Sequence, residues 1–147
     1  MATTLNGLDI NKGVVRRFLE GVETHDLQAI GRCLAPDVVQ HYQHPSNHND
    51  DGTQSAASIT GRDAIVDEIG TYFHKLYQEG TVRITIQTMV AEGDYVAARF
   101  ILKALTARLG EDYENYYFFL YRVVGGEVVE YWEYLDSKYA AAKLFGS

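Results

Sequence analysis

The 147-residue sequence contains one cysteine, two prolines, and 13 lysine and arginine residues against 20 aspartates and glutamates. The single cysteine excludes an intramolecular disulfide framework and a cysteine-rich zinc site. The net charge of −7 argues against nucleic acid or an anionic membrane as the main partner. No apolar run approaches the roughly 18 residues of a membrane span, and the first residues lack the apolar core of a signal peptide. We therefore expect a soluble, cytoplasmic protein with one domain over residues 1–147.

The two halves of the chain differ in periodicity. The first half has apolar residues at helical spacing, which predicts helices capped by Asn11 and Asp26 and a third that opens at Thr60 and Asp63. Residues 38–43 predict a short strand, and the polar stretch 46–58 predicts a surface loop. In the second half apolar and polar residues alternate, which predicts strands near 82–92, 95–108, 115–124 and 127–135, followed by a short last helix. This order predicts an α+β fold, in which helices cover one face of a curved antiparallel sheet.

The aromatic residues are the most unusual part of the composition, with 11 tyrosines and six phenylalanines that gather in the C-terminal half. One strand is apolar on both faces, since Tyr117 and Phe119 alternate with Tyr116 and Phe118. A sheet with one face in water would alternate more clearly between apolar and polar side chains. We therefore expect helices on one face and a second copy of the chain on the other, which predicts a homodimer.

Three motifs carry a family resemblance: LAPDVVQH (34–41), AEGDYVAARF (91–100) and YENYYFFLYRVVGGEVVEYWEYLD (113–136). In this order they resemble the nuclear transport factor 2-like superfamily, and within it the ketosteroid isomerase-related and SnoaL-like polyketide cyclase group. The resemblance covers nearly the whole chain. It implies a cone-shaped fold whose curved sheet carries helices on its concave face, with a pocket between the two layers. It does not identify a reaction, because this fold hosts many functions.

Glu133 is the strongest candidate for a catalytic residue. Strand alternation puts its carboxylate on the same face as Val129, Tyr131 and Leu135, among apolar and aromatic groups. Such surroundings disfavour the charged form, so the pKa of Glu133 should rise toward neutrality, where a carboxyl can transfer protons. The resemblance also implies a working carboxylate at this position. The alternative is an exposed glutamate at the end of a strand.

Histidine is the side chain that titrates near neutral pH, which draws attention to the segment His41-Tyr42-Gln43-His44-Pro45. Alternation puts His41 and Gln43 on one face and Tyr42 and His44 on the other. The resemblance implies a pocket-facing histidine, for which we select His41 as a second catalytic residue, with His44 as its rival. Gln43 and His44 are also expected to contact substrate. The alternative is surface histidines beside a polar loop.

Four further residues are expected to bind substrate. The resemblance implies that Arg99 faces the pocket, where it could hold a carboxylate or enolate oxygen. In the same mapping Asn115 and Tyr117 offer hydrogen-bond donors to a polarised carbonyl, and Tyr131 lies beside Glu133. Arg99 could equally lie on a solvated strand face, and Tyr117 could be part of the core.

Two differences from known members of the superfamily disfavour two of its reactions, epoxide hydrolysis and steroid isomerisation. Limonene epoxide hydrolases have an Arg-x-Asp pair on the strand of Arg99, and here Ile101 takes the place of the aspartate. Ketosteroid isomerases have an aspartate base before a proline, and here that residue is His44. We therefore expect a cyclase, isomerase or dehydratase that uses acid/base catalysis on a small hydrophobic carbonyl compound, without cofactor or metal. The alternatives are a non-catalytic ligand-binding or assembly module and an epoxide-hydrolase-like hydrolase.

Overall fold

The computed structural model describes residues 6–42 and 58–146. The order of the helices and strands is α1 (Gly7–Thr24), α2 (Leu27–Cys33), β1 (Leu34–His41), β2 (Ser58–Thr60), α3 (Arg62–Leu76), β3 (Arg83–Glu92), β4 (Tyr95–Leu105), β5 (Asp112–Val124), β6 (Glu127–Leu135), α4 (Ser137–Ala140) and the π-helical turn η1 (Ala141–Phe145). The predicted α+β class is confirmed. Strand β2 was not expected and pairs with β1 in register His41 to Ser58.

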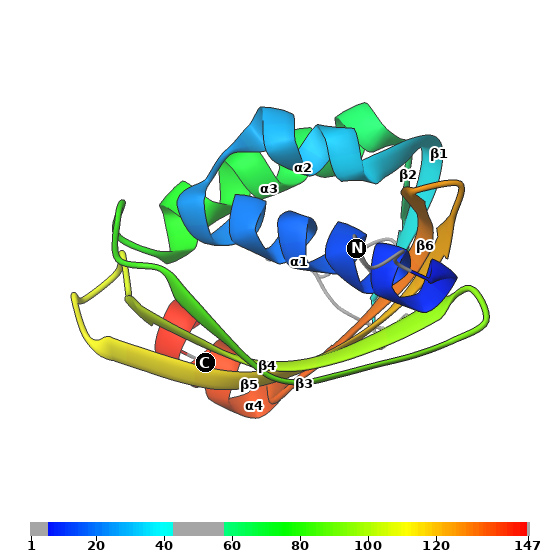
Figure 1. Cartoon of the computed structure of the whole chain (residues 1–147). Helices are drawn as coiled ribbons and strands as arrows, with labels where there is room; N and C mark the ends of the chain where they lie inside the picture. The colour runs from blue at the N-terminus through cyan, green and yellow to red at the C-terminus, as the bar shows by residue number, and fades with distance from the viewer. Residues whose placement is uncertain (1–5, 43–57, 147) are drawn as a thin grey trace.

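The strands form a single curved sheet in the order β2-β1-β6-β5-β4-β3. Helices α1, α2 and α3 lie on its concave side (Figure 1). The predicted antiparallel pairing holds for the other neighbouring strands of this sheet, whereas β1 runs parallel to β6. A parallel neighbour requires a long crossover connection, and here everything from the end of β1 to the start of β6 provides it. The N-terminal and C-terminal parts of the chain therefore meet in the middle of the sheet.

Local signals account for most of the element boundaries. Asp26 caps α2 as predicted, and Asp136 caps α4. Each accepts a hydrogen bond from the backbone N–H three residues later. Helix α1 begins earlier than predicted, because Asn6 rather than Asn11 is its cap. The β5–β6 hairpin turns at Gly125 and Gly126, whose φ angles of 60° and 80° suit glycine.

The core lies between α1 and the concave face of the sheet. Phe18 of α1 packs its ring edge-on against Tyr121 of β5 and Tyr131 of β6, at centroid distances of 5.7 and 5.5 Å. All three residues are buried. Among the described helices, none combines the length and the apolarity needed to cross a bilayer. The concave face of β5 and β6 is thus a layer of stacked rings, and this layer contains the candidate site.

Candidate functional site

Glu133 lies on β6 within this aromatic layer. It is paired with Phe119 of β5, while Tyr131, two residues earlier on the same face, is paired with Tyr121. The rings of Phe119 and Tyr131 stack at 6.2 Å. The predicted placement of Glu133 among aromatic groups is confirmed. A carboxylate on this face is shielded from water and lies in an environment of low polarity.

Gln40 of β1 holds the Glu133 carboxylate in place. Its side-chain Nε2 donates a hydrogen bond of 2.9 Å to Glu133 Oε2, and its Oε1 accepts one of 3.0 Å from the Tyr131 hydroxyl. Burial raises the pKa of Glu133 from 4.5 to about 7, and the hydrogen bond from Gln40 opposes that rise. The residue as a whole is only partly buried, yet its carboxyl end is deep enough for desolvation to dominate. Glu133 is thus a carboxyl group that exchanges its proton near neutral pH.

Phenol groups surround this carboxyl. Burial raises the pKa of Tyr42, Tyr77 and Tyr131, and the negative charge of Glu133 adds to the effect in each case. These side chains therefore stay protonated at neutral pH and can act as hydrogen-bond donors. Tyr42 follows β1 and Tyr77 follows α3, so that elements distant in the sequence converge on Glu133.

Tyr117 and Asn115 belong to a buried hydrogen-bond chain on the same face of β5. Asn115 Nδ2 donates to the Tyr113 hydroxyl at 2.9 Å, and that hydroxyl lies 2.8 Å from the Tyr117 hydroxyl. The Tyr117 hydroxyl in turn lies 3.5 Å from that of Tyr77. Asn115 also donates to the carbonyl oxygen of Asp136, and its Oδ1 accepts from the Tyr116 N–H. Asn115 is therefore committed to protein partners, and Tyr117 joins this chain to Tyr77, whose pKa the charge of Glu133 also raises.

His41 does not lie with Glu133, so its expected orientation was wrong. In the parallel β1–β6 pairing, Gln40 is opposite Tyr131 and His41 is opposite Trp132. His41 therefore points to the convex face, where it stacks on Trp132 at 5.1 Å and its Nε2 lies 2.6 Å from Glu130 Oε2. The alternation along this strand was predicted correctly, but the inward face is that of Gln40 and Tyr42. Gln43 and His44 lie outside the described residues.

Arg99 also lies on the convex face, whereas the family resemblance implied that it faces the pocket. Its neighbours Ala98 and Phe100 are buried, whereas Arg99 is exposed and paired with Phe118, itself 47% exposed. The physical reason is that β4 turns its small and apolar residues toward the helices, which leaves the charged ones in water. Asn115 and Tyr117 face inward as expected, but Arg99 does not join them.

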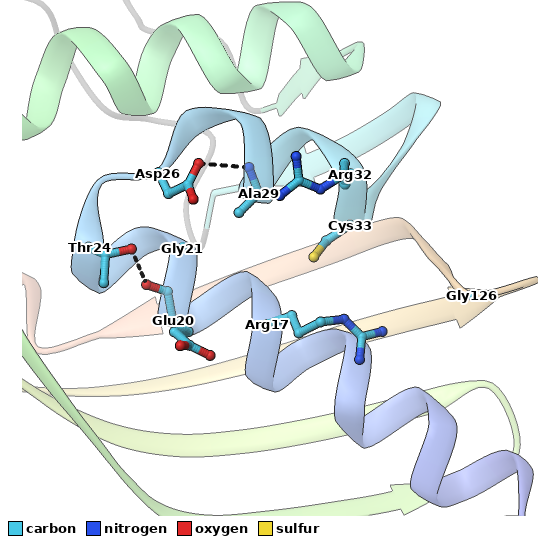
Figure 2. A pocket seen from close by; sticks show the side chains of 9 residues that line it. All are labelled: Arg17, Glu20, Gly21, Thr24, Asp26, Ala29, Arg32, Cys33 and Gly126. Carbon is cyan, nitrogen blue, oxygen red and sulfur yellow. Dashed lines mark hydrogen bonds between the residues drawn. The ribbon is translucent and has the colours of Figure 1, made fainter.

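A separate cavity lies between α1 and α2, and the side chains that line it are drawn in Figure 2. Its volume is about 410 Å³. Its lining includes Cys33 with Arg17 and Arg32 on one side, and Glu20 and Asp26 on the other. Burial raises the pKa of the Cys33 thiol although both arginines act in the opposite direction. The thiol is therefore the neutral, unreactive form at physiological pH. This cavity offers no acid/base group comparable to Glu133.

A second cavity, of about 470 Å³, lies where the ends of α1 and α3 approach each other. Its lining includes the neighbouring rings of His25 and His74, at 4.4 Å, together with Phe73 and Tyr77. Burial and the proximity of His74 lower the pKa of His25. Tyr77 links this cavity to the surroundings of Glu133. Within residues 6–42 and 58–146, no three His, Cys, Asp or Glu side chains converge as a metal site.

Several residues of the site were not expected from the sequence. Four residues lie near Glu133 although the sequence predicts a site role for none of them: Gln40, Tyr42, Tyr77 and Tyr121. Val38 is buried two residues before Gln40, so both side chains lie on the inward face of β1. Tyr77 belongs to the buried core, and nothing in the sequence distinguishes its hydroxyl from that of a purely structural tyrosine.

Comparisons with known proteins agree with this architecture. The family model for the SnoaL-like domain matches residues 15–131. A proposed SnoaL-like polyketide cyclase from Jannaschia sp. CCS1 has a similar structure, with a TM-score of 0.77, 13% identity, and coverage of 100% of this chain and 99% of that one. IdmH, a proposed polyketide cyclase from Streptomyces antibioticus, has a TM-score of 0.71 and 22% identity, with 91% and 97% covered. At these identities the similarity shows the fold alone. No curated protein sequence matches the chain.

Proposed function

The chain belongs to the SnoaL-like domain family, and on that basis we propose that it is a cofactor-independent acid/base enzyme for a small, hydrophobic carbonyl compound. One observation carries the proposal: the carboxyl of Glu133 has a pKa of about 7 and is held by Gln40 within a layer of aromatic rings. A general base is most effective when its pKa lies near the working pH. The apolar surroundings favour a substrate of the same character.

In the proposed reaction the Glu133 carboxylate removes a proton from the carbon next to the substrate's carbonyl. The electron pair of that C–H bond moves to the carbonyl oxygen, which gives an enolate, and Glu133 becomes a carboxylic acid. The acid then returns the proton to another atom of the same intermediate, so Glu133 ends as it began. Isomerisation needs these two steps alone. In ring closure the enolate carbon first bonds to a second carbonyl carbon of the substrate, whose oxygen then takes the proton. In dehydration the proton goes to a β-hydroxyl oxygen as its C–O bond breaks, and water leaves.

The enolate oxygen requires a hydrogen-bond donor, and Tyr117 is placed to supply one. If Tyr113 accepts from Asn115 and donates to Tyr117, the Tyr117 proton is free for Tyr77 or for a substrate oxygen. Glu133 and Tyr117 share a face of the sheet and are diagonal neighbours, because Tyr117 pairs with Leu135 and Phe119 with Glu133. A fixed donor aimed at the developing charge can contribute about 10²-fold or more to the rate.

A hydrolase of the limonene epoxide hydrolase type is less well supported. Such an enzyme would need a second carboxylate facing Glu133 from β4. Among the described residues β4 presents Ala98, Phe100 and Leu102 to the interior, and all three are apolar.

Exchange of substrate protons with solvent tests the proposal. The protein is incubated in D₂O with a panel of cyclohexanones, cyclohexenones and β-diketones, and deuterium at the α-carbon is followed by NMR. Wild type should accelerate exchange of at least one compound, with a rate that rises with pH through a midpoint near 7. Glu133→Gln should abolish the acceleration.

Glu130→Gln is the matched control, because Glu130 lies three residues away on β6 and pairs with His41 on the convex face. It should exchange protons as fast as wild type. Equal rates in wild type and Glu133→Gln would contradict the proposal. Exchange in the presence of wild type that is no faster than in buffer alone would favour a non-catalytic ligand-binding or assembly module.

We also propose that the protein is a homodimer assembled through the convex face of the sheet. Tyr116, Phe118 and Tyr134 are 57%, 47% and 46% exposed on this face. Phe118 and Tyr134 are opposite each other in the β5–β6 register. A group of exposed aromatic side chains on one sheet face is typical of a protein interface.

A further inference from the structure

Tyr121 of β5 contains a hydroxyl group that the fold leaves without a partner. The residue is completely buried, and its ring packs against Phe18 at 5.7 Å, Phe119 at 5.8 Å and Tyr131 at 5.6 Å. Within the described part of the chain, its Oη is the buried side-chain polar atom that has no hydrogen bond. Burying a hydroxyl without a hydrogen bond costs stability, and phenylalanine would fill the same space without that cost. Packing alone therefore does not explain why residue 121 is a tyrosine rather than a phenylalanine.

Tyr121 lies close to Glu133, which suggests a role for its hydroxyl in the proposed site. Tyr121 is opposite Tyr131 and Phe119 is opposite Glu133, so Tyr121 and Glu133 share a face and are diagonal neighbours across the two strands. The charge of Glu133 contributes to the raised pKa of Tyr121, after burial. Tyr121 thus faces the carboxyl that the proposed reaction uses.

The adjacent tyrosine provides a direct contrast. Tyr131 is equally buried on the same face, yet its hydroxyl donates to Gln40 Oε1 at 3.0 Å. The other end of Gln40 holds Glu133 Oε2. Tyr131 is therefore part of the support of the carboxyl, whereas Tyr121 adds nothing to that support. Two similar phenols on neighbouring strands have different hydrogen-bond environments.

We propose that the Tyr121 hydroxyl donates a hydrogen bond to the carbonyl or enolate oxygen of a substrate bound against Glu133. This inference rests on the proposed acid/base function and adds a substrate-contacting residue to it. Tyr121 keeps its proton at neutral pH, so it stabilises the oxygen without taking part in proton transfer. Because Tyr121 is completely buried, a hydrogen bond from its hydroxyl is stronger than it would be in solution.

Binding of a planar enolate mimic tests this inference separately from turnover. We would use 4-nitrophenol, whose absorbance reports both binding and ionisation, and titrate it with wild type, Tyr121→Phe, Glu133→Gln and Glu130→Gln. Tyr121→Phe should weaken binding by about tenfold or more, since it removes one donor to a charged oxygen. Glu133→Gln should still bind the probe, which keeps the inference testable if the proposed reaction fails.

Two further measurements separate a contact from a structural role. Tyr121→Phe removes no internal hydrogen bond, so its urea midpoint should equal or exceed that of wild type. Tyr131→Phe breaks the bond to Gln40 and should lower the midpoint. In the deuterium-exchange assay Tyr121→Phe should lose about 10²-fold in rate, comparable to the loss of one donor to a developing oxyanion.

Three results would overturn the inference. The first is equal affinity of wild type and Tyr121→Phe for 4-nitrophenol, and the second is no measurable binding to wild type. The third is a lowered urea midpoint of Tyr121→Phe with unchanged affinity, which would identify the hydroxyl as the partner of a structural water. If Glu133→Gln exchanges protons like wild type while Tyr121→Phe loses affinity, the proposed function fails and the Tyr121 contact stands.

Discussion

The raised pKa of Glu133 has a measurable effect on stability. In the unfolded chain the carboxyl titrates near 4.5, and in the folded protein it titrates near 7. Between these values the folded state holds a proton that the unfolded state has released, so unfolding becomes easier as the pH rises. The stability contribution of this proton is fully present below pH 4.5 and is lost as the pH rises through 7. At about 1.36 kcal/mol per pH unit, the loss is roughly 3 kcal/mol.

Glu133→Gln removes this dependence and keeps the shape of the side chain. The amide oxygen of the glutamine can still accept the hydrogen bond from Gln40. We therefore expect variant and wild type to have similar unfolding free energies near pH 4.5. The variant should become more stable than wild type as the pH rises, by roughly 3 kcal/mol at pH 8.

Urea unfolding followed by tryptophan fluorescence from pH 4.5 to 8.5 measures the difference, since all other titrating groups contribute equally to both proteins. Glu130→Gln, which changes a side chain on the convex face, is the control and should not become more stable than wild type as the pH rises. A stability difference between wild type and Glu133→Gln that stays constant with pH would refute the assignment of a desolvated carboxyl at Glu133. The same result would weaken the proposed acid/base role.

Three other substitutions test neighbouring parts of the structure. Gln40→Met removes the hydrogen bond that lowers the pKa of Glu133, so the midpoint of the pH profile of deuterium exchange should move above 7. Arg99→Ala should leave the exchange rate within about twofold of wild type, since Arg99 lies on the convex face; a loss of tenfold or more would return Arg99 to the site. Phe118→Lys should shift sedimentation velocity from dimer to monomer without loss of helical circular dichroism, and an unchanged sedimentation coefficient would argue against this interface.

The faces of β5 and β6 were predictable because period-two alternation applies directly to long, regular strands. Tyr117 and Phe119 face the helices, Phe118 faces outward, and Glu133 lies with Tyr131, all as the pattern indicated. Hairpin pairing preserves that order, since a short turn leaves little freedom in register. The candidate carboxyl could therefore be selected from the sequence.

The contribution of β1 could not be predicted in the same way. Alternation separates Gln40 from His41, but it does not say which of two polar side chains faces inward. That choice depends on the parallel pairing with β6, a contact between residues about 90 positions apart in the chain. The preference for His41 came from its chemistry, and the tertiary structure selected Gln40. The Tyr121 hydroxyl is a similar case, because the absence of a partner is visible only in three dimensions.

The parallel pairing of β1 with β6 also determines when the site can form. During synthesis Gln40 leaves the ribosome long before Glu133, which is 93 residues later, and the two cannot meet until the last strand is available. The helices and the β3–β4 hairpin can form earlier from local contacts. Insertion of β6 between β1 and β5 then closes the sheet and brings the carboxyl to its amide partner in one step. A chain interrupted before β6 therefore lacks the Gln40–Glu133 pair, and under the proposed function its activity would report that the whole domain has been completed.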